Sequence, residues 1–229
     1  MTPTRHVVYL HGFTSSPASS KAVRFSRELR AAGVTVDCPD LNRPAFETLT
    51  ITRMLDEVRR CVAAAPSAPI ALIGSSLGGF VALHAAAEAE RANERSGAQG
   101  PPPPKVDRLV LLAPAVDFGG NRLRQLGDVD IAEWRRTGRL TVFHHAENRP
   151  RGVGFQLYED AAQYDAFDAS FTQPALIFQG RQDDAVDPVS VERWAAGRSN
   201  VELRLVDDGH QLSASIDLIW AESREFLGL

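Results

Sequence analysis

Ser76 is flanked by Gly74 and Gly78, which gives the pattern Gly-x-Ser-x-Gly. An apolar run at residues 70–73 precedes it, and residues 80–90 have the composition of a helix. Between a strand and a helix, this pattern is typical of a strained turn that exposes its serine hydroxyl as a nucleophile. The residues two before and two after the serine crowd each other in such a turn, which requires glycine at both positions. The alternative is a glycine-rich turn that binds a phosphate or nothing.

A serine hydroxyl becomes a good nucleophile only when a neighbouring base takes its proton. His210 is the candidate base, because it follows the last expected strand, residues 201–206, on a loop just before the C-terminal helix. His84 is expected to pack within the helix that follows Ser76. For His144 and His145 we expect a place at the surface, with a gate or a substrate contact as the alternative.

The histidine needs a carboxylate to hold its tautomer and to stabilise the imidazolium. Three aspartates follow the apolar run at residues 175–179, and the spacing Gly180-x-x-Asp183-x-x-Val186 predicts one carboxylate at the edge of the sheet. Asp184 would then face solvent, and Asp187 would cap the next helix ahead of a proline. Asp187 is the alternative acid, and a solvated acidic turn is the alternative to any catalytic role.

Two backbone N–H groups are candidates for stabilising an oxyanion. One belongs to Leu77, at the positive end of the helix after the serine. The other belongs to Phe13, in the loop after the first apolar run, where Gly12 leaves space for a substrate and His11 is expected to brace the loop. The order Ser76, Asp183, His210 along the chain is the order found in enzymes that carry this kind of serine turn.

Apolar runs alternate with helical patterns along the chain, which predicts an α/β fold. The mainly parallel central sheet would have about six strands, with helices on both faces. The candidate strands lie at residues 7–10, 34–38, 70–73, 108–114, 175–179 and 201–206. We expect a single domain over residues 1–229.

One segment, residues 116–171, interrupts this alternation where a short crossover would suffice. Its aromatic residues are Trp134, Phe143, Phe155, Tyr158, Tyr164 and Phe167. Residues 141–143 and 155–158 could pair as a hairpin around residues 148–152. Long insertions at the ends of strands are usually lids or binding loops, so a lid is expected, with a purely structural cap as the alternative.

Composition excludes several classes of partner. The 229 residues have a formal net charge of −4, which gives no reason to expect nucleic acid or an anionic membrane. Cys38 and Cys61 show neither metal-ligand spacing nor a disulfide framework, so a reducing cytoplasm is expected. No run is apolar and long enough to span a bilayer. Four prolines at residues 101–104 predict an exposed loop, with a proline-rich ligand as the alternative.

Residues 9–17 (Tyr-Leu-His-Gly-Phe-Thr-Ser-Ser-Pro), Lys21-Ala22 and residues 74–79 (Gly-Ser-Ser-Leu-Gly-Gly) together resemble the α/β-hydrolase superfamily. Within it, the chain is most similar to the small bacterial esterases of the YqiA type, and its ending at residues 226–229 is similar too. The resemblance implies esterase or thioesterase activity without a cofactor, on a fold that begins directly at the strand before the oxyanion loop. The longer insertion and the proline-rich loop depart from that pattern, so substrate preference is not carried over.

These observations predict a serine hydrolase that cleaves small carboxylic esters or thioesters through an acyl-enzyme, with Ser76, His210 and Asp183 as the triad. A peptidase, a lactonase or a perhydrolase could use the same triad. A catalytically silent protein of this fold that binds a ligand or a partner is the alternative from another class.

Overall fold

A computed structural model describes residues 6–65, 69–96, 106–119 and 127–229. Among these residues, six strands form one sheet in the spatial order β2-β1-β3-β4-β7-β8, and all five neighbouring pairs are parallel. The strands are β1 (His6–Leu10), β2 (Thr35–Asp37), β3 (Ile70–Ser75), β4 (Val106–Leu112), β7 (Ala175–Gly180) and β8 (Val201–Val206). The predicted fold class is therefore confirmed. The proline-rich residues 101–104 lie outside the described residues.

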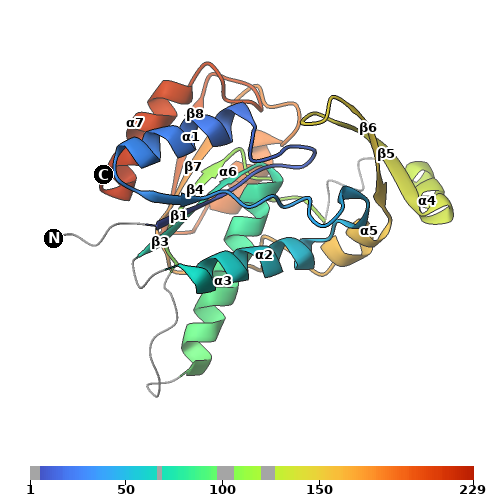
Figure 1. Ribbon diagram of the computed structural model, residues 1–229, viewed down its shortest axis with the longest axis horizontal. Helices are drawn as coiled ribbons and strands as arrows, with labels where there is room; N and C mark the ends of the chain where they lie inside the picture. The colour runs from blue at the N-terminus through green and yellow to red at the C-terminus, as the bar shows by residue number, and fades with distance from the viewer. Residues whose placement is uncertain (1–5, 66–68, 97–105, 120–126) are drawn as a thin grey trace.

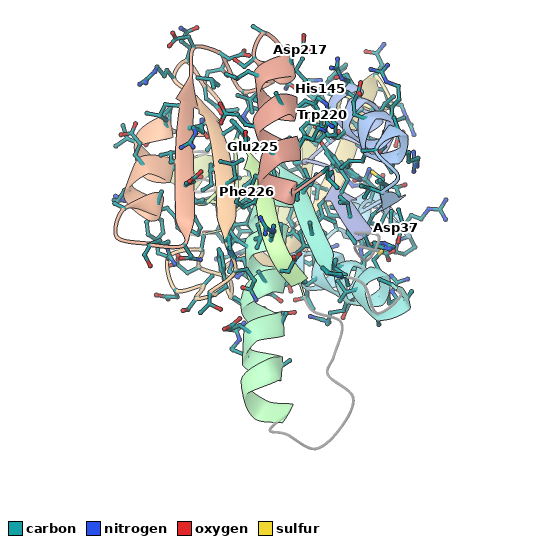
Figure 2. The ribbon with its side chains drawn as sticks, turned by 90° about the vertical axis from the view of Figure 1, so that its left-hand side faces the viewer. Asp37, His145, Asp217, Trp220, Glu225 and Phe226 are labelled. Carbon is teal, nitrogen blue, oxygen red and sulfur yellow. The ribbon has the colours of Figure 1, made fainter. Side chains whose placement is uncertain are left out.

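Helices cover both faces of this sheet (Figure 1). On one face lie α1 (Ser20–Ala31) and α7 (Ile216–Leu227), whose Phe25 and Trp220 rings meet edge-on with centroids 5.7 Å apart (Figure 2). On the other face lie α2 (Ile51–Ala64), α3 (Leu77–Ser96) and α6 (Pro188–Ala195). A 3-10 turn, η1 (Phe46–Thr48), precedes α2.

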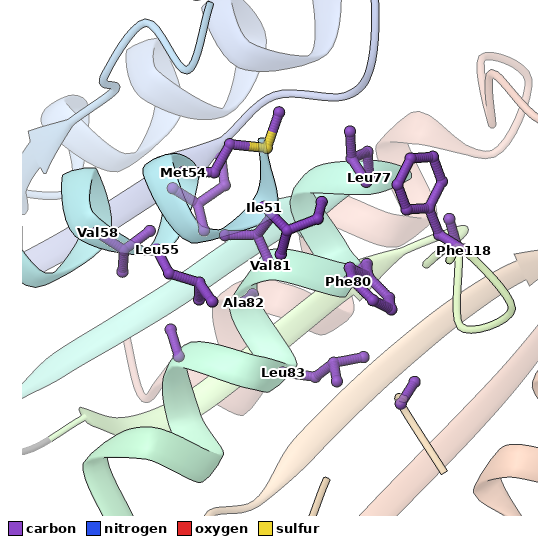
Figure 3. Close-up of a cluster of buried hydrophobic side chains, with 14 of the residues drawn as sticks. Ile51, Met54, Leu55, Val58, Leu77, Phe80, Val81, Ala82, Leu83 and Phe118 are labelled. Atoms are coloured by element: carbon purple, nitrogen blue, oxygen red, sulfur yellow. The ribbon is translucent and has the colours of Figure 1, made fainter. Parts of the chain in front are cut away.

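The inner strands β1, β3 and β7 lack polar alternation because they are buried on both sides. In β3, Ile70 and Leu72 join the core beneath α2 and α3, whereas Ala71 and Ile73 join the core beneath α1 and α7. Apolar side chains of α2 and α3 pack together in the first of these cores (Figure 3). Removing so much apolar surface from water on both faces is the main favourable contribution to folding, and it fixes the sheet that carries the site.

The direction in which the chain adds strands reverses between β1 and β3. From β1 the chain first places β2 on one side, then returns to place β3 on the other side. Loops that leave two such strands at their carboxyl ends diverge toward opposite faces, and the crevice between them is where open α/β sheets bind ligands. The loops after β1 and β3 are the ones that carry Gly12 and Ser76.

Helix boundaries follow local signals in the sequence. Ser19 caps α1, its hydroxyl accepting the Ala22 N–H, and Thr50 caps α2 in the same way. Gly33 has a φ of 80°, so it follows α1 in the left-handed conformation that glycine adopts without strain. These caps set where each helix begins and ends relative to the sheet.

The insertion contains α4 (Gly127–Thr137), β5 (Arg139–His144), β6 (Arg149–Gly154) and α5 (Gln156–Ala161). Strands β5 and β6 form a separate antiparallel pair. The hairpin is thus present, but its predicted second strand at residues 155–158 is wrong, because α5 occupies those positions. Pro150 and two glycines made residues 149–154 resemble a turn. In a two-stranded ribbon, however, each strand has a free edge, which tolerates proline.

The aromatic residues of the insertion are divided between core and surface. Trp134 is fully buried, its indole N–H donates to the Val153 carbonyl at 3.0 Å, and the Phe155 ring lies edge-on against it. Phe143, by contrast, is about half exposed. Most of these rings therefore complete the hydrophobic core on the α2 side.

Candidate active site

Ser76 occupies the turn between β3 and α3 with a φ of 54°, a left-handed backbone conformation that is unusual for a side chain larger than glycine. A Cβ on Gly74 would collide with the backbone of Gly78, and a Cβ on Gly78 would collide with the backbone of Leu10 in β1. A Cβ on Gly79 would lie 2.9 Å from the Cβ of Pro114, a less severe approach. The two flanking glycines are therefore required by backbone packing, as the sequence pattern predicts.

His210 reaches the serine from the loop after β8. Its Nε2 lies 3.1 Å from Ser76 Oγ, within hydrogen-bond distance. The loop is fixed by Asp208, whose carboxylate accepts the Gly209 N–H at 2.8 Å and the Ser215 N–H at 2.9 Å. The imidazole is thus held at the carboxyl end of the sheet with one ring nitrogen toward the hydroxyl.

Asp183 lies behind His210, and its two carboxylate oxygens are 3.0 Å and 2.9 Å from His210 Nδ1. The same carboxylate accepts the Ala185 and Val186 N–H groups at 2.9 Å and 2.8 Å. Burial acts to raise the pKa of Asp183, but the hydrogen bonds from His210, Val186 and Gln179 outweigh it, so the pKa is lowered. The carboxylate is therefore ionised at neutral pH and fixes an Nδ1–H tautomer of His210.

The neighbouring aspartates lie where the spacing predicts. Asp184 is exposed, and Val186 is fully buried. Asp187 caps α6, its carboxylate accepting the Val189 and Ser190 N–H groups at 3.1 Å and 3.2 Å. Only Asp183 of the three contacts His210 among the described residues.

The loop after β1 lies against the serine. A Cβ on Gly12 would sit 3.2 Å from Ser76 Cβ and 3.8 Å from its hydroxyl oxygen, so glycine keeps the approach to the hydroxyl open. His11 is buried and braces the loop, with Nδ1 2.9 Å from the Gly12 carbonyl and Nε2 accepting the Leu41 N–H at 3.0 Å. The Phe13 ring packs at a tilt against Phe46, with ring centroids 5.5 Å apart.

A cavity of about 600 Å³ opens over this site. Its walls come from the loop after β1, the start of α1, the serine turn and the loops of Ala185 and His210. The turn between β5 and β6 contributes His145 and Ala146. That turn is tied to the loop after β1, because the Ala146 N–H donates to the carbonyl of Thr14 at 3.1 Å.

Two other histidines of the chain are buried away from the serine. His84 lies between Phe80 and Tyr164 at ring distances of 4.5 Å and 5.3 Å, and burial lowers its pKa to about 4. It packs within α3, as expected. The surface placement expected for His144 is wrong, since its ring is buried edge-on against Phe46 at 4.7 Å. In β5 its side chain points inward, whereas His145 follows in the turn and faces outward (Figure 2).

Three residues near the site escaped the sequence analysis. Gln179 is buried at the end of β7, and its amide donates to Asp183 Oδ2 at 2.9 Å. Asp208 holds the His210 loop, and the Lys21 ammonium donates to the His210 carbonyl at 3.4 Å. Gln179 carried a signal, because a polar residue ends an otherwise apolar strand just before the acid loop. Lys21 was noted only for the family resemblance, and its contact could not be inferred, since it lies 189 residues from its partner.

A parallel sheet with helices on both faces and a serine turn after its third strand defines the α/β-hydrolase fold. The chain belongs to the family described as Uncharacterised protein family UPF0227, whose model matches residues 6–220. This finding agrees with the resemblance to the YqiA-type proteins. No curated protein matches the chain significantly.

Solved structures share this fold over nearly the whole chain. A protein of Agrobacterium vitis S4 named as a hydrolase is 25% identical with a TM-score of 0.82, covering 97% of this chain and 87% of its own. Est1E of Butyrivibrio proteoclasticus, solved with ferulic acid, is 21% identical with a TM-score of 0.79, covering 99% and 89%. A monoacylglycerol lipase of Paleococcus ferrophilus is 14% identical with a TM-score of 0.71, covering 97% and 93%.

Within the described ranges, none of the helices combines the length and the apolar character that crossing a bilayer would need.

Proposed function

We propose that this protein is a serine hydrolase that cleaves small carboxylic esters or thioesters. The observation that carries the proposal is the continuous hydrogen-bonded arrangement of Ser76, His210 and Asp183, of which Ser76 and His210 line a cavity. Such an arrangement activates a hydroxyl for attack on an acyl carbonyl. The similarity to a protein named as a hydrolase, to Est1E and to a monoacylglycerol lipase supports the same class of reaction.

In the proposed reaction, Ser76 Oγ attacks the acyl carbonyl while His210 Nε2 takes the hydroxyl proton. Asp183 stabilises the resulting imidazolium through Nδ1–H. The tetrahedral intermediate collapses as His210 returns the proton to the leaving alcohol or thiol, which leaves the acyl group on Ser76. Water then attacks, His210 again accepts and returns the proton, and the carboxylic acid departs.

The oxyanion is assigned to the N–H groups of Leu77 and Phe13. Leu77 is the first residue of α3, where N–H groups have no partner within the helix and the helix dipole favours negative charge. Phe13 follows Gly12, whose missing side chain leaves room beside Ser76. We assign residues 116–171 as a partial lid, of which the turn at His145 and Ala146 is the part at the cavity.

A fluorophosphonate probe tests this proposal directly, because it labels only activated serines. We expect stoichiometric labelling at Ser76, no labelling of Ser76→Ala, and a loss of p-nitrophenyl ester turnover of up to about a million-fold in that variant. Labelling that persists in Ser76→Ala would refute the assignment of the nucleophile. A folded wild-type protein that neither reacts with the probe nor hydrolyses esters would instead favour a binding protein of this fold.

A further inference from the structure

The cavity above Ser76 is lined by a positive charge, although the protein as a whole is negatively charged. The chain has a net charge of −4, yet the described residues that line the cavity include Lys21 and no aspartate or glutamate. The other polar groups of its lining are hydroxyls, imidazoles and the Gln211 amide. The hydroxyls belong to Thr14, Ser15, Ser16, Ser19, Ser20, Ser75 and Ser76. The described wall can therefore attract an anion and offers it no repelling carboxylate.

Lys21 is the only lysine or arginine in that described lining. It lies at the second position of α1, partly buried, and its ammonium donates to the His210 carbonyl at 3.4 Å. Among the described residues, no carboxylate forms an ion pair with it, although Asp183 and Asp208 act on it from farther away. A partly buried ammonium without a paired carboxylate is costly, and an anionic ligand would offset that cost.

The ammonium is charged under ordinary conditions. Burial lowers the pKa of Lys21 to about 8, while the carboxylates of Asp183 and Asp208 act to raise it. At neutral pH most molecules therefore carry the positive charge in the cavity. Any anion bound there would favour the charged form further.

We propose that the substrate carries a carboxylate or phosphate group a few bonds from its scissile carbonyl, and that Lys21 binds this group while the carbonyl lies at Ser76. This proposal rests on the proposed hydrolase function. The anionic group must lie only a few bonds from the scissile carbonyl because Lys21 and Ser76 contact the same residue. Lys21 contacts the backbone carbonyl of His210, and Ser76 contacts its ring. A cavity of about 600 Å³ holds a small ester together with such a group.

The residues just before α1 add donors to the lining of the same cavity. Ser16 Oγ accepts the Ala18 N–H at 3.2 Å, and Ser19 Oγ accepts the Ala22 N–H at 3.4 Å. A hydroxyl that accepts in this way keeps its own hydrogen available to donate to an anion. His145, on the hairpin turn, also lines the cavity and supplies an imidazole that can donate as well.

Matched pairs of esters test the proposal. The first pair is the p-nitrophenyl monoester of glutaric acid against p-nitrophenyl valerate, which places a carboxylate on the acyl side. The second pair is butyryl glycerol phosphate against butyryl glycerol, which places a phosphate on the alcohol side. For each pair, the ratio of kcat/KM for the anionic member to that for the neutral member is measured in the wild type, Lys21→Met and Lys21→Arg. Arg60→Met serves as the control, since it removes one positive charge from an exposed site on α2.

We expect the wild type to prefer the anionic member of at least one pair. Lys21→Met should lower that ratio by about 10- to 100-fold, the loss typical of a hydrogen bond to a charged group. Lys21→Arg should retain most of the preference, and Arg60→Met should leave the ratio unchanged. A preference in one pair only identifies which anion the site takes. A wild type without any preference, or a preference that persists in Lys21→Met, overturns the proposal.

Binding measured in Ser76→Ala separates this proposal from the proposed function. Calorimetric titration with glutarate and with glycerol phosphate should show binding to Ser76→Ala that is lost in the double variant with Lys21→Met. If the wild type hydrolyses none of the four esters, the proposed function fails. The anion site then stands if this Lys21-dependent binding is observed, and it falls if neither anion binds.

Discussion

The serine turn and the β5–β6 hairpin both reach the same cavity, but different kinds of contact hold them there. At the serine turn, backbone packs directly on backbone, because a side chain on Gly74 or Gly78 would strike main-chain atoms. Gly180, the last residue of β7 before the loop of Asp183, packs in the same way on the carbonyls of Asp208 and Gly209. In the hairpin, a Cβ on Gly152 would meet only the side chain of Arg139 among its nearest atoms.

The hairpin is attached to the rest of the protein mainly through side chains. Arg151 forms a two-pronged hydrogen bond with Glu47 of η1, both at 2.9 Å, and its guanidinium lies 5.7 Å from the Phe46 ring centroid. Glu147 pairs with Arg151 from the turn itself. The loops that carry Ser76, Asp183 and His210 are thus held together by contacts between backbone atoms. The hairpin turn, which would contact the substrate, is instead held by side chains, and each of these could be substituted without changing the backbone.

The largest expected effect is the difference in kcat between substitutions of Asp183 and Asp187, the two candidate acids after β7. Asp183→Asn replaces the carboxylate that fixes the His210 tautomer, and kcat should fall by about ten-thousand-fold. Asp187→Asn should stay within about threefold, because asparagine caps a helix as well as aspartate does. Steady-state kinetics with a p-nitrophenyl ester on both folded variants makes the comparison. The reverse order of effects would move the acid to Asp187.

A pair of glycine substitutions tests whether backbone packing distinguishes the two regions. Gly78→Ala forces apart the serine turn and β1, so the free energy of unfolding should fall by about 1–3 kcal/mol or more. Gly152→Ala should cost less than about 1 kcal/mol, because the long side chain of Arg139 can move aside. Urea unfolding with an unchanged m-value provides the measurement. Equal losses of unfolding free energy in both variants would show that backbone packing does not distinguish the serine turn from the hairpin.

The smallest effect concerns the attachment of the hairpin. Arg151→Met removes a partly buried ion pair, which should reduce the free energy of unfolding by about 1 kcal/mol or less. Because the hairpin turn is bonded to Thr14, KM should rise by up to about fivefold while kcat changes little. Arg149→Met is the control, since Arg149 pairs with Glu147 at an exposed site. A large loss of kcat in Arg151→Met would show that the hairpin also positions the reacting groups.

The sequence predicted those parts of the site that depend on local backbone geometry. Gly74 and Gly78 indicate that β3, α3 and β1 approach one another closely. The spacing from Gly180 to Val186 distinguishes Asp183, which faces His210, from the neighbouring aspartates. Short apolar runs predicted the inner strands, because both faces of the sheet are buried there.

The remainder depended on contacts between residues far apart in the chain. The second hairpin strand was missed because its proline and glycines are tolerated only at the free edge of a ribbon. His144 was expected at the surface, but Phe46, nearly one hundred positions earlier in the chain, covers its ring. The contact of Lys21 with the His210 carbonyl likewise appears only when the fold brings α1 beside the His210 loop.

The separation of Ser76 from His210 by 134 positions has a consequence for the protein while it is being made. A growing chain presents the serine long before the imidazole has been synthesised, and a serine without its base is a poor nucleophile. On the proposed mechanism, a nascent chain therefore cannot hydrolyse the esters around it. Activity begins only when β8 joins the edge of the sheet and delivers the last residue of the site.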